Sequence, residues 1–213
     1  MNEIGLFEAI YSQLQITHYR RDPVPIELIQ KVIDAATMAP NGNNTQCWEF
    51  VVITDPALVE QVGTIYREEW LDMMGRTPPP NESSAHRHAR HLAEHMHEVP
   101  AIILVCADHT RGPRNFKLGD PVVRGKVAAS IFPALQNLFL AARAFGLGTR
   151  VTMAHAAREP ELKALLGIPD HVETVVLTPI GYPEGAFRRP RRRPSAEFVH
   201  YDHFGNRQPP TDA

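Results

Sequence analysis

Apolar residues recur at intervals of three and four in several stretches of the chain. In residues 23–40 the apolar positions include Ile26, Ile29, Val32 and Ile33, with Pro25 placed for a first helical turn. This spacing is typical of an amphipathic helix, here ending near Pro40. The stretches 56–74, 85–100 and 159–169 also favour helices, whereas the proline-rich segment 75–84 predicts an exposed loop.

Other stretches are short and continuously apolar. Residues 48–55, 101–108 and 172–183 are rich in β-branched side chains, which predicts strands, the last two buried on both faces. Residues 122–145 are longer, apolar on most sides and interrupted by Pro133. They predict a helix buried in a core or an interface, ending at Gly146 and Gly148. This irregular mixture, without internal repeats, predicts a layered α/β or α+β domain.

Composition and charge narrow the function classes. The 213 residues are 43% hydrophobic, which suits one domain over 1–213. A formal net charge of -2 gives no reason to expect nucleic acid or membrane as a partner, so small molecules are the expected ligands. The two cysteines, the N-terminus and the lack of an apolar run near 20 residues favour a cytoplasmic protein. The arginines at 188–193 lack interleaved aromatic residues, so a nucleotide phosphate is their expected anion.

The loop "APNGNNTQCWEF" at residues 39–50 concentrates small polar groups between a predicted helix and a predicted strand. Gly42 permits close approach of the backbone, and the amides of Asn44 and Gln46 both donate and accept hydrogen bonds. Two interpretations follow from the residues alone. The loop holds the edge of a flat heterocycle, or its asparagines satisfy a turn after the helix.

Pro40 through Phe50 resembles the P-S-x-x-N-x-Q-P-W-x-F signature of the FMN-dependent nitroreductase family. The stretches "LQNLFLAARAFGLGTR", "LLGIPDHVETVVLTPIGYP" and "RRPRRRP" resemble its later elements in the same order, so the resemblance spans residues 7 to 202. It implies an α+β, nitroreductase-like fold with a central, mostly antiparallel sheet flanked by helices. It also implies an intertwined homodimer with two FMN molecules at the interface, a variable excursion at about 67–98 and a C-terminal extension at about 186–213.

The resemblance also implies cofactor-binding residues and a reaction. FMN contacts are expected at Pro40, Asn41, Gly42, Asn44 and Gln46, at Thr152, Met153 and Ala154 along the flavin N5 edge, and at Arg192 or Arg191, with Arg193 a near-equal candidate, for the phosphate. The implied activity is hydride transfer from NAD(P)H through flavin N5 to a nitroaromatic, a quinone or a similar electron-poor small molecule. The chemistry then belongs to the flavin, and no catalytic side chain is assigned.

Two departures qualify the resemblance. The resemblance implies an arginine and a serine that bind the flavin phosphate where this chain has Gln13 and Gln15, and a basic residue facing flavin N1 and O2 where it has Thr17. Shifting the register by one restores no arginine. Cys47 stands where proline is usual. We therefore expect weakened FMN binding or a changed reaction. The alternatives are a specialised flavin reaction without NAD(P)H turnover (dehalogenation, azoline oxidation or flavin fragmentation) and a non-catalytic flavin-binding or storage protein.

A histidine-rich segment carries His86, His88, His91, His95 and His97. The main expectation is a solvated helix, since no cysteine or carboxylate completes a ligand set at standard spacing, and no metal site is assigned. A histidine or Trp70 stacking over substrate is an alternative, and His155 is expected to be structural.

Overall fold

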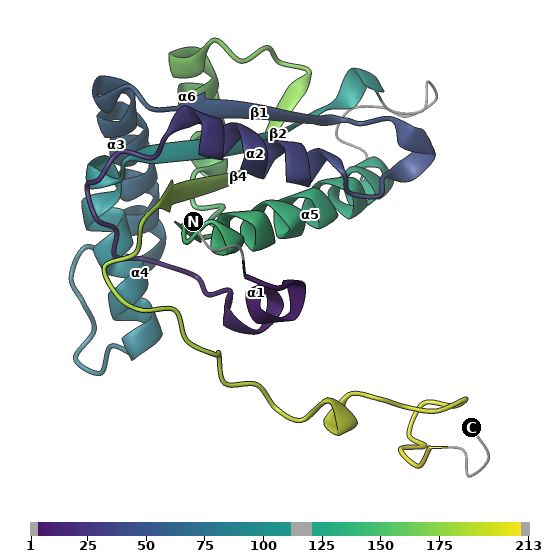
Figure 1. Ribbon diagram of the computed structural model, residues 1–213. Helices are drawn as coiled ribbons and strands as arrows, with labels where there is room; N and C mark the ends of the chain where they lie inside the picture. The colour runs from purple at the N-terminus through teal and green to yellow at the C-terminus, as the bar shows by residue number, and fades with distance from the viewer. Residues whose placement is uncertain (1–3, 112–120, 210–213) are drawn as a thin grey trace.

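The computed structural model describes residues 4–111 and 121–209 (Figure 1). Its α-helices are α1 (Leu6–Ser12), α2 (Ile26–Thr37), α3 (Pro56–Met74), α4 (Ser84–His95), α5 (Pro121–Ala144) and α6 (Glu159–Leu166). Its strands are β1 (Trp48–Ile53), β2 (Ala101–Asp108), β3 (Gly148–Thr149) and β4 (Val172–Gly181). Short 3-10 turns lie at η1 (Gly42–Asn44), η2 (Met96–Glu98), η3 (His109–Arg111), η4 (Ala156–Arg158) and η5 (Ser195–Glu197).

The helix boundaries follow local signals in the sequence. The Asp55 side chain caps α3 by accepting hydrogen bonds from the N–H groups of Ala57 (2.9 Å) and Leu58 (3.0 Å), and Pro56 occupies the first turn. The helix ends at Gly75, whose φ of 86° suits glycine. Helix α3 therefore has the limits that the sequence predicts.

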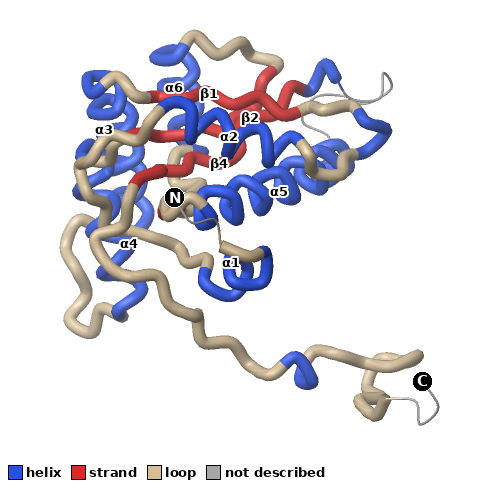
Figure 2. The backbone as a smooth tube through the Cα atoms, viewed as in Figure 1, coloured by secondary structure: helices blue, strands red, loops and turns tan. Residues whose placement is uncertain are grey.

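The sheet has the strand order β1-β2-β4-β3, and each adjacent pair is antiparallel. Figure 2 shows β1, β2 and β4 side by side. Trp48 pairs with Ala107 at one end of the sheet, and Gly148 pairs with Gly181 at the other. Every residue of β2 is buried, as its continuous apolar run predicts. The expected α+β fold with an antiparallel central sheet is confirmed.

Successive side chains of a strand point to opposite faces, and β2 divides its residues between two cores in this way. Ile103 and Val105 pack with α2 and α5, while Ile102 and Leu104 pack with α3 and α4. The molecule therefore has three layers, with the sheet between two groups of helices (Figure 1).

Helix α5 is continuous through Pro133, so the single helix predicted for residues 122–145 is confirmed. The stretch Val127–Ala144 is the one segment within the described ranges that is long and apolar enough to cross a membrane, judged by length and composition. In the fold this stretch packs against α2, and Ile131 and Leu138 are buried in the core.

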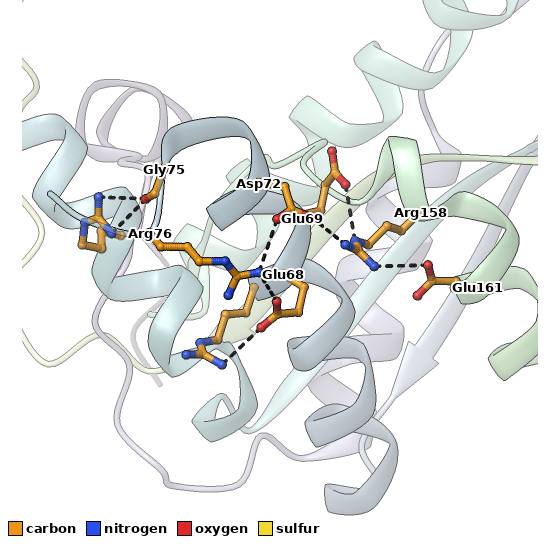
Figure 3. Close-up of polar contacts among 9 residues, drawn as sticks. Glu68, Glu69, Asp72, Gly75, Arg76, Arg158 and Glu161 are labelled. Atoms are coloured by element: carbon orange, nitrogen blue, oxygen red, sulfur yellow. Dashed lines mark hydrogen bonds and ion pairs between the residues drawn. The ribbon is translucent and has the colours of Figure 1, made fainter. Parts of the chain in front are cut away.

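An ion-pair network fastens η4 to α3 and α6 (Figure 3). The guanidinium of Arg158 contacts Asp72 at 2.6 Å, Glu161 at 3.2 Å and Glu69 at 3.4 Å. Asp72 and Glu69 stand on α3, and Glu161 stands in the first turn of α6. The network thus fixes Arg158, at the end of the segment 150–158 that follows β3.

Candidate functional site

The loop between α2 and β1 has a strained backbone. Asn43, Asn44 and Gln46 have φ values of 53°, 54° and 48°, in the left-handed region that non-glycine residues avoid. The side-chain Oδ1 of Asn41 accepts a hydrogen bond from the N–H of Gln46 at 2.9 Å. The N–H of Gly42 donates to Ser130 Oγ on α5 at 3.3 Å. Such strain persists only when surrounding contacts hold it, and it is concentrated at functional sites.

Five of the predicted cofactor residues lie on this loop. Pro40, Gly42, Asn44 and Gln46 are exposed and Asn41 is partly buried. The loop therefore presents amide groups and open backbone at the surface, as a surface that contacts a ligand requires.

A separate open cavity of about 900 Å³ lies at the other end of the sheet. It is lined by residues 14–18, by Ala85 and His88 of α4, by Arg150, and by residues 183–188 after β4. Residues 14–18 reach this position through β3, because Gln15 forms a parallel bridge with Thr149 and the N–H of Ile16 donates to Thr149 O at 2.9 Å.

Arg150 is the cation that comes from the interior of the fold into this cavity. It is partly buried, and its Nε is buried without a hydrogen-bond partner. Within residues 4–111 and 121–209 its guanidinium has no ion pair with a carboxylate. Arg188, which also lines the cavity, is exposed.

Gln15 and Thr17, two of the positions that lack the family's usual residues, also line this cavity. Gln15 Oε1 accepts a hydrogen bond from the N–H of Val151 at 2.7 Å. Thr17 Oγ1 lies 2.9 Å from His18 Nδ1. Both side chains are thus engaged by the chain itself, and neither brings a charge.

The predicted N5 segment runs from Arg150 towards the middle of β4. Thr152 and Leu177 exchange backbone hydrogen bonds at 2.9 and 3.2 Å. Thr152 Oγ1 also contacts the hydroxyl of Tyr66 at 3.3 Å, and burial raises the pKa of Tyr66. The Met153 side chain is 51% exposed and Ala154 is buried, so this segment offers one open edge.

One chain does not bring the predicted site residues together. The loop at 40–46 precedes Trp48, at the end of the sheet where Trp48 pairs with Ala107, whereas β3 lies at the opposite end, where Ile180 pairs with Ala101. The six residues of β1 alone span about 20 Å. The loop and the cavity are therefore separated by the length of the sheet.

Arg191 and Arg192 lie in a third place. The tail leaves the body after residues 183–189 and extends away from it (Figure 1). Both arginines are exposed, and Arg192 Nη1 donates to Arg191 O at 2.9 Å. Arg193 instead pairs with Glu197 at 2.6 Å.

The histidines of α4 form a stack at the rim of the cavity. The rings of His18 and His91 are parallel within 8°, with centroids 3.8 Å apart, and His95 continues the stack at 4.3 Å. Burial lowers the pKa of both His18 and His91. In the part of the chain that the structure describes, no group of three or more His, Cys, Asp or Glu side chains is arranged to hold a metal.

Trp70 is not available as a stacking surface. It is 4% exposed, and the guanidinium of Arg90 lies 4.9 Å from its ring centroid. His155 is fully buried, with Nε2 3.4 Å from Thr174 O, and burial lowers its pKa.

Arg150 is the site residue that the sequence interpretation missed. It ends the stretch "LQNLFLAARAFGLGTR", which entered the sequence interpretation only through its resemblance to a family element. No local signal marks it, because the two-residue strand β3 that places Arg150 forms only through pairing with β4.

The chain is similar to several known proteins. It is 29% identical over 191 residues to iodotyrosine deiodinase 1 of Rattus norvegicus, covering 86% of this chain and 64% of the rat protein's length. It is 25% identical over 201 residues to an NADH dehydrogenase of Thermus thermophilus, covering 82% of this chain and 85% of that protein. Since both identities are below 30%, the activities of these relatives are not transferred by similarity alone.

The fold is also that of solved structures. The crystal structure of oxidized iodotyrosine deiodinase bound to FMN and 3-iodo-L-tyrosine superposes with a TM-score of 0.75 at 20% identity, covering 94% of this chain and all of that chain. The model of the Nitroreductase family matches residues 16–182, a range that contains the strained loop, Arg150 and the segment 152–154. This chain therefore belongs to the nitroreductase family.

Proposed function

We propose that this protein is an FMN-dependent oxidoreductase that works as a homodimer. The observation that carries the proposal is the cavity at β3, where Arg150 stands beside residues 15–17 and next to the segment 152–154 and has no ion pair among the described residues. A partly buried cation without a partner is costly, so the cavity suits a ligand with anionic character. The residues therefore fit a flavin nucleotide.

The separation of loop and cavity supports the homodimer. For a flavin bound in the cavity at β3 to touch the loop at 40–46 as well, we infer that the loop comes from a second copy, because the length of the sheet separates the two within one chain. The surface of α1 supports the same arrangement, because Leu6, Phe7, Ile10 and Tyr11 are all more than 40% exposed on one short helix. Contiguous exposed apolar side chains of this kind mark an interaction surface.

Bound FMN would supply the redox chemistry, receiving a hydride from NAD(P)H at N5 and passing electrons to an electron-poor acceptor. The loop residues Asn41, Gly42, Asn44 and Gln46, with Pro40, would contact the isoalloxazine and ribityl groups from the second chain. Thr152, Met153 and Ala154 would line the N5 edge, and Arg192 or Arg191 would bind the phosphate. The protein's part is to bind and orient, so no side chain is assigned as an acid or base.

The likeness to iodotyrosine deiodinase favours a second candidate function, the reductive removal of halogen from an aromatic ring. The first candidate has its own support in the NADH dehydrogenase relative. The two differ in whether a nicotinamide reduces the flavin and in which acceptor reoxidises it.

The test is the visible absorption spectrum of the purified protein with added FMN, followed anaerobically by NADPH and then NADH. Bleaching of the flavin band by a nicotinamide, with recovery on adding a nitroaromatic or quinone, is the result expected. Bleaching by dithionite only, with recovery and iodide release on adding 3-iodo-L-tyrosine, would establish the second candidate instead. Reduced flavin that no acceptor reoxidises would point to storage.

Sedimentation tests the homodimer separately. The protein with FMN should sediment at twice the chain mass of 23.9 kDa. A monomer that binds FMN as tightly as the dimer does would refute a site shared between two chains.

A further inference from the structure

The inference concerns Arg150 and rests on the proposed function. Arg150 directly follows β3, which is held between residues 15–16 on one side and β4 on the other. Because both neighbours fix the backbone here, the base of the side chain has little freedom to leave the cavity. Its Nε is already removed from solvent.

The described chain provides no counter-charge for this guanidinium. Glu184 is the carboxylate that lines the same cavity, yet it is exposed and makes no ion pair with Arg150. The Arg150 guanidinium thus lines the cavity with its Nε removed from solvent and without a carboxylate partner among the described residues, which suits a ligand that supplies negative charge.

The surroundings of Arg150 indicate which part of a flavin it meets. Its charge acts on the hydroxyls of Tyr19 and Tyr66, and the hydroxyl of Tyr66 is hydrogen-bonded to Thr152. Thr152 belongs to the segment assigned to the flavin ring. Arg150 therefore lies on the ring side of the site, whereas the exposed Arg188 and the tail arginines remain for the phosphate.

Position 17 strengthens this placement. Thr17 stands where the resemblance expects a basic residue facing flavin N1 and O2, and its hydroxyl is taken by His18 Nδ1 at 2.9 Å. Thr17 lines the same cavity as Arg150. The charge missing from one element is thus present on a neighbouring one.

We propose that Arg150 supplies the positive charge at the N1–C2=O2 edge of the isoalloxazine, in place of the basic residue absent at position 17. Two-electron reduction leaves negative charge at this edge, so a guanidinium there stabilises the reduced flavin more than the oxidised one. Charge near N1 is one of the means by which proteins tune flavin electronics. Arg150 thereby sets the reduction potential of this protein, and it does so without contacting the phosphate.

The test compares Arg150→Gln with Arg150→Lys and with Lys31→Gln, an exposed α2 residue outside the site that controls for net charge. For each protein, the affinities for oxidised FMN and riboflavin and the midpoint potential of bound FMN are measured. R150Q should bind reduced flavin at least tenfold less tightly relative to oxidised flavin, a fall of about 30 mV for a two-electron couple. Its loss of affinity should be equal for FMN and riboflavin, R150K should keep most of the potential, and K31Q should match the parent.

Two results would overturn the assignment. An unchanged midpoint potential in folded R150Q would mean that Arg150 does not face the ring. A loss of affinity for FMN with none for riboflavin would place Arg150 at the phosphate. If R150Q does not fold, Arg150→Met takes its place as a neutral side chain of similar length. The same fall in potential in folded R150M supports the proposal, and an unchanged potential or a lost affinity for FMN alone refutes it. Failure of the parent protein to bind either flavin would instead refute the proposed function, so the two failures are distinguishable.

Discussion

Gly148 gives a sharp test of how β3 positions the cavity. A Cβ added here would lie 2.6 Å from Ile16 Cγ1 and 2.9 Å from Ile16 Cβ. Carbon atoms in contact are about 3.5–4.0 Å apart, so Gly148→Ala requires a displacement of roughly 1 Å. Ile16 cannot move alone, because its N–H is bonded to Thr149 O and Gln15 bridges the same residue.

Overpacking of this kind costs about 1–3 kcal/mol. For a chain of this size each kcal/mol lowers the melting temperature by about 2–4 °C, so we expect a decrease of about 2–12 °C for Gly148→Ala. Flavin affinity should also fall, because Gln15 and Thr17 move with Ile16. Calorimetry and a fluorescence titration with FMN measure the two effects.

The matched control is Gly125→Ala. Its Cβ would meet nothing within 4 Å, and it lies inside α5, where alanine is the better helix former, so stability should stay level or rise by up to about 1 kcal/mol. Ile16→Ala should rescue part of the loss in Gly148→Ala, with a coupling of at least about 0.5 kcal/mol. Full stability of Gly148→Ala, or strict additivity in the double variant, would refute the close approach as the cause.

Three further outcomes are expected. Burial lowers the pKa of His155, His18 and His91, so the unfolded chain binds more protons than the folded chain near pH 6. The free energy of unfolding should therefore be greatest above about pH 6.5 and decrease on acidification. Melting temperatures that stay level between about pH 8 and about pH 5.5 would contradict this. Asn41→Ala removes the acceptor for the Gln46 N–H, worth about 1 kcal/mol, and should weaken FMN binding about fivefold in a fluorescence titration, whereas Asn41→Asp keeps the acceptor and should keep the melting temperature. Burial raises the pKa of Cys106 to about 12, so mass spectrometry should find this thiol unalkylated by iodoacetamide until the protein is unfolded in guanidinium.

The sequence was most informative where periodicity and local signals agree. Asp55-Pro56 and Gly75 define α3, and the apolar run 101–108 defines β2, because capping and continuous burial act within a few residues. Helix α1 was not predicted, since its apolar residues are mainly exposed and give no core-facing period. Strand β3 was not predicted either, because two residues become a strand only through pairing with Gly181 and Ile180.

Some features of the candidate site could likewise be predicted from local sequence, and others could not. The polar loop at 39–50 could be recognised from composition, but the left-handed backbone of Asn43, Asn44 and Gln46 could not, since asparagine and glutamine also occur in ordinary turns. Arg150 has no ion pair within residues 4–111 and 121–209 because none of their carboxylates reaches it in space. No local pattern records such an absence of contact.

The cavity draws its walls from residues 14–18, from α4, from Arg150 and from residues 183–188, so it joins parts of the chain made early and late in synthesis. Contacts between residues this distant in sequence slow folding, because the entropy cost of closing the loop precedes the stabilisation that the strand pairing provides. On the ribosome, β2 is complete roughly 70 residues before β4 can cover its second edge, an interval of about 4–15 s at typical synthesis rates. During that time the backbone N–H and C=O groups along this edge of β2 are unpaired, and we expect the nascent chain to be prone to mispairing there.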